Sequence, residues 1–183
     1  MPWKNTNTRY GTLLITLHWL MLILFVAVYA AIELRELYPK GSDPREALKA
    51  WHFMLGLSVL VLVSIRIYAR LAFIEPNITP APSMLQNFAA KVVHLALYGL
   101  MIGMPILGWS VLSAAGKPVP FFGLELPSLI AENKELAKTL KELHQTAGLV
   151  GYYLIGLHAA AALFHHHILK DDTLTRILPR RQR

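Results

Sequence analysis

The sequence predicts an all-α integral membrane protein, a four-helix bundle with up-down topology and both termini in the cytoplasm. Three observations lead to this prediction: 55% of the 183 residues are hydrophobic, only 16% are charged, and four apolar stretches are long enough to cross a bilayer. An average soluble domain carries about 25% charged residues, so the composition disfavours a soluble fold. The spanning segments should be helices because a helix satisfies its own backbone polar groups in lipid.

The four apolar stretches set the expected spans, and we expect residues 1–183 to form a single membrane domain. A hydrocarbon core is crossed by roughly 20 helical residues. Pro105 lies within the third span, where it should kink the helix without ending it. The expected spans are residues 12–34, 50–72, 90–115 and 142–169.

The first span has an alternative interpretation as the apolar core of a cleavable signal peptide, since Ala30 and Ala31 resemble the small residues of a cleavage site. However, its run of 20 apolar residues exceeds the core of a typical signal peptide. The length therefore favours a transmembrane helix.

Positive charges indicate the orientation of the chain. The termini and the loop between the second and third spans carry 10 Lys and Arg residues, against 8 on the opposite side. The margin is small, but a basic tail from Lys170 to Arg183 directly follows an apolar span. Cytoplasmic segments carry such an excess, so we place both termini in the cytoplasm. This explains the net charge of +7 without nucleic acid as a partner.

The chain contains no cysteine. A disulfide, a thiolate-bound iron–sulfur cluster and covalent attachment of c-type haem are therefore excluded. It also lacks the G-x-G-x-x-G and Walker patterns, so we expect no site for a nicotinamide, a flavin or a nucleoside triphosphate. Any haem must be held without a covalent bond to the protein, which means a b-type haem.

Histidines inside the spans are the candidate cofactor ligands, because ionisable residues within a membrane are costly and usually mark a functional site. His52 and His144 lie near the starts of the second and fourth spans, and no other histidine shares that level. Ligation by two imidazoles leaves no open iron position, which suits one-electron transfer. Gly56, Gly148 and Gly151 follow these histidines by four or seven residues and would leave space for a porphyrin, although small residues also allow close helix packing.

A second layer of histidines is expected toward the cytoplasm. His158 follows His144 by 14 residues, which is about 21 Å along a helix and about 40° from the same face, so two cofactors would fit across one bilayer. His18, His94 and His158 can all reach this depth, and spacing alone leaves the ligand pair open. The alanines at residues 159–162 favour the pairing of His158 with His18.

Three further histidines, His165, His166 and His167, lie at the cytoplasmic end of the fourth span. Histidines at such a boundary are commonly solvated interfacial residues. His165 is nonetheless a candidate proton donor to a quinone, because it follows His158 by seven residues on nearly the same helix face. We assign no role to His166 and His167.

Short motifs, in this order and at this spacing, resemble the bacterial cytochrome b561 family across essentially the whole chain. The motifs are Leu17-His18-Trp19, Trp51-His52, His94-Leu95, Leu143-His144, and Gly156-Leu157-His158-Ala159-Ala160-Ala161-Ala162-Leu163 followed by His165-His166, with Lys170-Asp171 and the basic tail at the end. The resemblance is strongest to a di-haem member that oxidises periplasmic superoxide to oxygen and passes the electron to ubiquinone.

This resemblance implies two b-type haems, each held by two histidines. It also makes His94 and His165 candidates for the environment of ubiquinone, the implied electron acceptor. Family members differ in their electron donor, so the resemblance indicates the cofactors more firmly than the reaction. The implied ligand pairs are His18 with His158 on the cytoplasmic side and His52 with His144 on the periplasmic side.

Residues 128–141 of the last outer loop are expected to form a short helix that runs into the fourth span. Three of its lysines are spaced i, i+4, i+7 and form one stripe that leads toward His144. Such a stripe would steer superoxide, a small anion, toward the outer haem and raise its on-rate by 10-fold or more at low salt. The alternative is a solvated face whose charge is cancelled by neighbouring glutamates. The residues concerned are Lys134, Lys138 and Lys141, with Glu132, Glu135 and Glu142.

Two other functions are compatible with the sequence. One is a cytochrome b subunit that anchors a periplasmic hydrogenase or dehydrogenase and presents a partner surface on its outer loops. The other is a haem-free membrane protein whose histidines bind metal ions. All these functions imply contact with lipid, and only the first alternative requires a protein partner.

Overall fold

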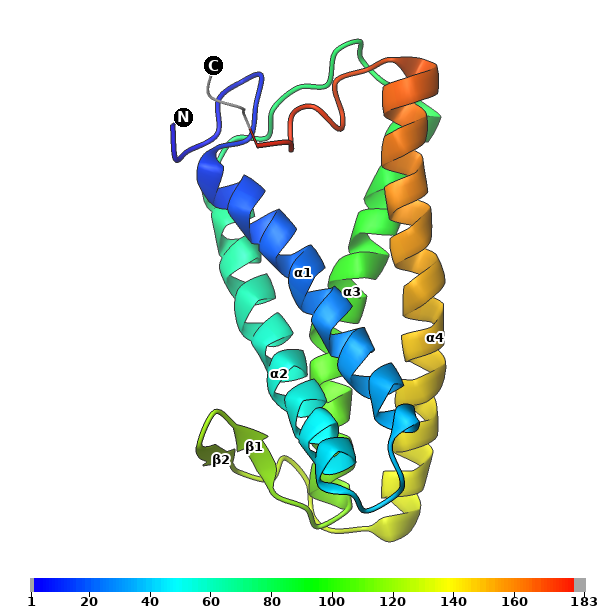
Figure 1. The fold of residues 1–183 in the computed structure, drawn as a ribbon. Helices are drawn as coiled ribbons and strands as arrows, with labels where there is room; N and C mark the ends of the chain where they lie inside the picture. Colours follow the sequence, from blue (N-terminus) through cyan, green and yellow to red (C-terminus); the bar gives the residue numbers. More distant parts are fainter. Residues whose placement is uncertain (1, 180–183) are drawn as a thin grey trace. The chain divides into compact units, whose positions relative to one another are not determined.

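The computed structural model describes residues 2–179 and confirms the all-α membrane architecture (Figure 1). Four helices are long and apolar enough to span a membrane. They are α1 (Thr12–Leu34), α2 (Asp43–Ala72), α3 (Met84–Ala114) and α4 (Lys134–Phe164). A 3₁₀ turn, η1 (Arg35–Leu37), follows α1, and a single π turn, η2 (His165–Leu169), follows α4. Helix α3 continues through Pro105, as expected.

Capping side chains set the starts of α3 and α4. Gln86 Oε1 accepts the backbone N–H of Ser83 at 2.7 Å, and Ser83 Oγ accepts the N–H of Gln86 at 3.3 Å. This reciprocal pair is a capping box. At α4, Asn133 Oδ1 accepts the N–H of Leu136 at 3.0 Å and so satisfies one of the free donors of the first turn.

The loop before α4 is not helical. This corrects the expectation that residues 128–141 form a helix running into the fourth span, since only the part from Lys134 onward is helical. Its backbone is bonded to α3 instead. Leu129 N–H donates to Ser113 Oγ at 3.0 Å, and Asn133 N–H donates to Ala114 O at 2.9 Å. Because these donors are used between segments rather than within a helix, α4 begins only at Lys134.

A two-stranded antiparallel hairpin, which the sequence analysis did not predict, lies between α3 and α4. Strand β1 (Val119–Phe121) pairs with β2 (Leu124–Leu126). Phe122 and Gly123 connect the strands with φ angles of 48° and 84°. Two left-handed residues in sequence form the tight turn that suits the twist of a hairpin, and Gly123 adopts that conformation without steric cost.

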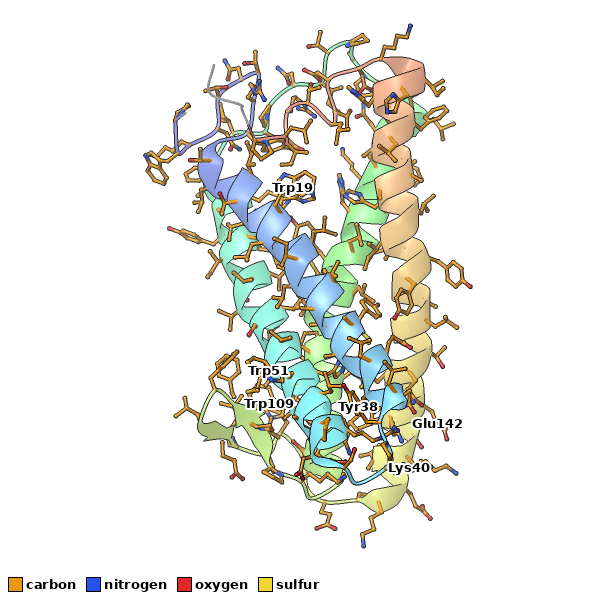
Figure 2. All side chains as sticks on the ribbon, in the orientation of Figure 1. Trp19, Tyr38, Lys40, Trp51, Trp109 and Glu142 are labelled. Atoms are coloured by element: carbon orange, nitrogen blue, oxygen red, sulfur yellow. The ribbon has the colours of Figure 1, made fainter. Side chains whose placement is uncertain are left out.

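The hairpin packs against α2 and α3 through apolar side chains. Val119 is 1% exposed and forms a buried cluster with Leu57 and Leu112. Trp109 borders this cluster, and its indole N–H donates to Pro127 O at 2.9 Å (Figure 2). The hairpin is therefore anchored to helices rather than free in solvent.

The chain divides into two compact units. Unit 1 comprises the described residues up to Leu20, Ser64–Gly99 and those from Val150 onward, and unit 2 comprises Met21–Val63 and Leu100–Leu149. Each of the four helices supplies residues to both units. His52 and His144 fall in unit 2, and all other histidines fall in unit 1.

The segments before α1 and after η2 lie side by side in unit 1 (Figure 1). An Arg9 guanidinium N–H donates to Thr175 O at 2.8 Å, and the Trp19 indole N–H donates to Ile177 O at 2.9 Å. Arg176, which is 5% exposed, donates to Pro76 O in the loop before α3. The C-terminal segment is thus an ordered part of unit 1.

Large apolar side chains cover the outside of the helices. Leu71 is 82% exposed, Leu95 and Tyr153 are each 74% exposed, and Ile23 is 65% exposed. Such extensive apolar exposure is unfavourable in water and is expected where helices face lipid tails. The spanning helices therefore contact lipid directly.

Candidate functional site

In unit 2, the rings of His52 on α2 and His144 on α4 face each other. Their centroids are 6.1 Å apart and their planes are inclined at 81°. His52 Nδ1 lies 3.0 Å from the carbonyl oxygen of Val28 on α1. A carbonyl only accepts, so Nδ1 donates, and the lone pair of His52 is on Nε2, the atom left to bind a metal.

Glycines make room around His144. A Cβ added at Gly108 on α3 would lie only 3.2 Å from His144 Cε1 and 3.6 Å from Nδ1. A Cβ at Gly56 would meet no atom within 4 Å, and one at Gly148 would meet only the end of Met104 at 3.7 Å. Gly56 and Gly148 were singled out from the sequence, whereas Gly108 was missed because it follows the histidine of its own helix, His94, by 14 residues rather than by one or two turns.

The spacing of the two rings fits ligation of a single metal atom. A bond from a metal to an imidazole nitrogen is about 2 Å, and the ring centre lies roughly 1 Å further, so two imidazoles on one metal have centres about 6 Å apart. The His52–His144 separation of 6.1 Å matches this value. His144 Nδ1 is buried and has no hydrogen-bond partner, so its ring orientation is set by packing against Gly108.

Unit 1 brings three histidines together. The ring centroid of His158 on α4 lies 6.3 Å from that of His18 on α1 and 5.5 Å from that of His94 on α3, with both pairs of planes inclined at 65°. The three side chains predicted from sequence to share one depth are therefore neighbours. Only the His18–His158 separation matches the roughly 6 Å expected for two imidazoles on one metal.

Arg66 on α2 lies beside this group of histidines. One of its guanidinium nitrogens donates to Leu14 O at 3.1 Å, and the other lies 3.5 Å from His18 Nδ1. No carboxylate pairs with Arg66 among residues 2–179. A cation within a spanning segment without an acidic partner is costly, which makes this position suited to an anionic group of a ligand.

At the C-terminal end of the fourth span, His165 contacts a carboxylate. Its Nδ1 is 2.5 Å from Asp171 Oδ2. Burial acts to raise the pKa of the Asp171 carboxyl, but hydrogen bonds with His165 and Thr173 outweigh burial and hold the pKa below its ordinary value. His166 and His167 stack edge to face with centroids 4.8 Å apart. Sequence reasoning found His165 but missed Asp171, because their contact depends on the turn between them.

The three predicted steering lysines, Lys134, Lys138 and Lys141, are exposed in the first turns of α4. Within the described part of the chain, no ion pair joins them to Glu132, Glu135 or Glu142. Elsewhere in unit 2, Arg45 pairs with Glu36 at 3.0 Å, and Lys49 pairs with Glu46. The lysine stripe therefore retains its charge, and its role in steering an anion stays a prediction.

Residues 2–179 contain no group of three or more His, Asp or Glu side chains arranged to hold a metal ion. The donor sets present are pairs of imidazoles, which suit haem iron, whose other ligands come from the porphyrin.

Comparison with known proteins gives consistent results over the whole chain. The sequence profile of the prokaryotic cytochrome b561 family matches residues 9–180. The chain is 37% identical over 174 residues to cytochrome b561 homolog 1 of Escherichia coli strain K12, covering 95% of this chain and 99% of that protein. It is 40% identical over 176 residues to the probable superoxide oxidase CybB of Yersinia pestis, covering 96% and 99% respectively. It is 29% identical over 175 residues to cytochrome b562 of Cereibacter sphaeroides, covering 92% and 94%.

Proposed function

The chain belongs to the prokaryotic cytochrome b561 family, and we propose that it is a di-haem superoxide:ubiquinone oxidoreductase of the bacterial inner membrane. Proteins of this family bind b-type haem and carry electrons in bacterial membranes. The chain is accordingly a multi-pass membrane oxidoreductase of electron transport. The donor, the acceptor and the number of haems are the parts that we propose.

The observation that carries this proposal is the presence of one facing histidine pair in each unit at a separation of about 6 Å, as one metal between two imidazoles requires. We assign His52 and His144 to an outer haem and His18 and His158 to an inner haem. Each bound haem would supply one-electron redox chemistry without an open iron position. We assign Arg66 to a carboxylate of the inner haem, since it has no acidic partner among the described residues.

Superoxide is the donor that the outer surface favours. The exposed lysine stripe raises the local concentration of a small anion near the start of α4, within about three helical turns of His144. The 40% identity to a protein named a probable superoxide oxidase supports the same donor. Oxidation of superoxide to oxygen releases one electron and needs no proton, so no acid or base is required at this end.

Reduction of ubiquinone accounts for the additional histidines of unit 1. Two superoxide anions, one ubiquinone and two protons become two oxygen molecules and one ubiquinol, which balances atoms and charge. The protons must come from the cytoplasmic side, where groups that can hold them are needed beside the quinone. His94 and His165 are the residues that we assign to this environment.

The proposal is tested with detergent-purified, oxidised protein. We expect two b-type haems per chain, rapid reduction of both on a pulse of superoxide, and ubiquinol formation when ubiquinone is in excess. Visible spectra and haem quantification per chain measure the first two, and chromatography of the quinone measures the third. Haems that remain oxidised after the pulse would exclude superoxide as the donor, and protein purified with a single haem would exclude the two-site assignment.

One observation favours the alternative of a subunit that receives electrons from a periplasmic hydrogenase or dehydrogenase. Phe122 and Leu124 on the hairpin are 54% and 65% exposed, and Phe122 contacts Trp51 with ring centroids 6.3 Å apart. A docked protein could cover this apolar surface on the outer side. Copurification of a periplasmic protein would support this alternative. A self-sufficient oxidoreductase would instead reduce its haems with superoxide in the absence of any other protein.

A further inference from the structure

The end of the fourth span folds back on itself and brings a carboxylate to His165. Helix α4 passes into the π turn η2, and Lys170 then adopts a left-handed conformation with a φ of 56°. The reversal lets Asp171 N–H donate to His165 O at 3.2 Å and places Asp171 Oδ2 2.5 Å from His165 Nδ1. Residues six apart in sequence thus meet through both backbone and side chain.

Asp171 is held in one orientation. Its side chain is only 5% exposed, and its second oxygen, Oδ1, accepts the backbone N–H of Thr173 at 2.9 Å. With both oxygens engaged, the carboxylate cannot rotate away from the ring. Its pKa is held below the ordinary value, so the group is a carboxylate at any physiological pH.

A fixed carboxylate determines which nitrogen of His165 exchanges its proton. A carboxylate only accepts, so His165 keeps a hydrogen on Nδ1 whether the ring is neutral or cationic. Nε2 is then the atom that gains and loses a proton. This is the arrangement by which a buried carboxylate orients a catalytic imidazole in hydrolases, where replacing the carboxylate by an amide selects the wrong tautomer.

We propose that Asp171 is a positioning residue for quinone reduction, acting through His165, which delivers a proton from Nε2 to a quinone oxygen. The inference rests on the proposed function. In the step, the Nε2–H bond of the imidazolium breaks and an O–H bond forms on the quinone, whose electrons derive from superoxide under the proposed function. His165 is left neutral with its remaining hydrogen on Nδ1, held by Asp171, and Nε2 takes up the next proton from water.

Water has access beside this pair. A surface hollow of about 360 Å³ adjoins the Asp171 carboxylate. The charged and titratable groups that face it besides Asp171 are His166, Lys170 and Asp172, and Asp172 is already engaged by Thr79 N–H at 2.9 Å and by Arg176 at 3.4 Å. The hollow therefore provides a polar entry for protons from the cytoplasm next to the carboxylate. Its lining residues are Thr79, His166, Lys170, Asp171, Asp172 and Thr175.

The test uses Asp171→Asn in the full-length, haem-loaded protein, with His165→Gln, the double variant and Glu75→Gln as controls. An amide at position 171 can still accept from Thr173 N–H, but it presents an N–H to His165 Nδ1 and so favours the other tautomer. We expect the maximal rate of ubiquinol formation to fall roughly 10²-fold while the KM for ubiquinone changes less than about 2-fold. Haem content per chain and haem reduction by superoxide without quinone should be unchanged.

Two measurements separate a positioning role from a structural one. Nitrogen-15 histidine spectra, with the His165 signals identified by their loss in His165→Gln, should report hydrogen on Nδ1 in the wild type and on Nε2 in Asp171→Asn. The double variant should form ubiquinol no more slowly than His165→Gln alone, because Asp171 acts through that ring. Glu75→Gln, which alters an exposed carboxylate of unit 1 that does not line the hollow, should retain the wild-type rate.

The inference is overturned if Asp171→Asn forms ubiquinol at the wild-type rate, if Glu75→Gln is equally slow, or if the effects of Asp171→Asn and His165→Gln multiply in the double variant. These results would leave the proposed function intact, because the wild type would still reduce its haems with superoxide and form ubiquinol. A wild type that forms no ubiquinol would instead reject the proposed function itself and this inference with it.

Discussion

Units 1 and 2 each contain facing histidines, but the surroundings of these histidines differ. Unit 2 has only His52 and His144, with a backbone carbonyl on His52 Nδ1 and a glycine against His144. Unit 1 has three neighbouring histidines, the nearby cation Arg66 and, at the end of the span, the His165–Asp171 pair. A site that only transfers single electrons needs two ligands and a fixed tautomer. A site that reduces a quinone also needs proton donors, and the additional titratable groups lie in unit 1.

The largest expected effect is the loss of one haem from unit 2. Replacing His144 by leucine removes a ligand that has no substitute, because His52 is the only other histidine of that unit. Haem per chain should fall by half, and reduction by superoxide should be lost while the spectrum of the inner haem remains. His167→Leu, which alters an exposed histidine of unit 1, is the matched control and should retain both haems. Retention of both haems in His144→Leu would disprove the outer ligand pair.

The three histidines of unit 1 allow the comparison to be sharpened. His18→Leu should halve the haem content, since the His18–His158 separation of 6.3 Å fits ligation of one metal. His94→Leu should retain both haems and slow ubiquinol formation, because we assign His94 to the quinone. Quantification of haem in the two purified variants shows whether His18 or His94 pairs with His158. Should His94→Leu lose the haem and His18→Leu keep it, the ligand pair would be His94 with His158.

The outer lysines are predicted to act only on the rate of encounter. Replacing Lys134, Lys138 and Lys141 together by glutamine should lower the second-order rate with superoxide by about 10-fold at low salt and remove most of its dependence on ionic strength. Stopped-flow absorbance of the haems measures this rate. Lys49→Gln is the control, because Lys49 is already paired with Glu46. An unchanged salt dependence in the triple variant would show that these lysines do not steer the anion.

An added methyl group should have different effects at two glycine positions of α3, Gly108 and Gly103. Gly108→Ala adds a Cβ 3.2 Å from His144 Cε1, so the ring must shift, and we expect a loss of stability of about 1–3 kcal/mol together with a changed spectrum of the outer haem. Gly103→Ala on the same helix meets nothing within 4 Å and should be neutral or stabilising by up to about 1 kcal/mol. Thermal unfolding in detergent compares the two variants. Equal stability of both would mean that His144 does not depend on the space at Gly108.

The smallest expected effect concerns the stability of the C-terminal segment against pH. The pKa of Asp171 lies below its ordinary value of 3.8, so its carboxylate stabilises the folded state above that pH, and this stabilisation is lost as the pH falls through the lower folded-state pKa. Asp171→Asn lacks this pH-dependent stabilisation of the folded state. The difference in Tm between wild type and variant should therefore be largest near neutral pH and shrink toward acid. A constant difference across the range would show that the carboxylate's charge is not involved.

Much of the fold followed from local pattern. Four long apolar stretches are sufficient to predict four spanning helices, because lipid offers no hydrogen-bond partners to a backbone in any other open conformation. The hairpin was missed because its strands are three residues each and Phe122 is an unusual residue for a left-handed turn position. The start of α4 was placed too early because Leu129 and Asn133 bond to α3, a choice that no local propensity reveals.

The features of the candidate site likewise divide into those that the sequence predicted and those that only the structure revealed. Composition alone excluded thiolate chemistry and meant that any haem would be held without covalent attachment, and the depth of each histidine followed from the constant rise of a helix. Other features depend on contacts between segments distant in sequence: which rings face each other, the hydrogen bond from His52 to Val28 O, and the position of Gly108 against His144. The contact of Asp171 with His165 depends on a specific turn. Periodicity specifies a face and a level along one helix. Only the packing of several helices decides which side chains meet there, because that choice is made by mutual shape and hydrogen bonding rather than by the order of residues in any one segment.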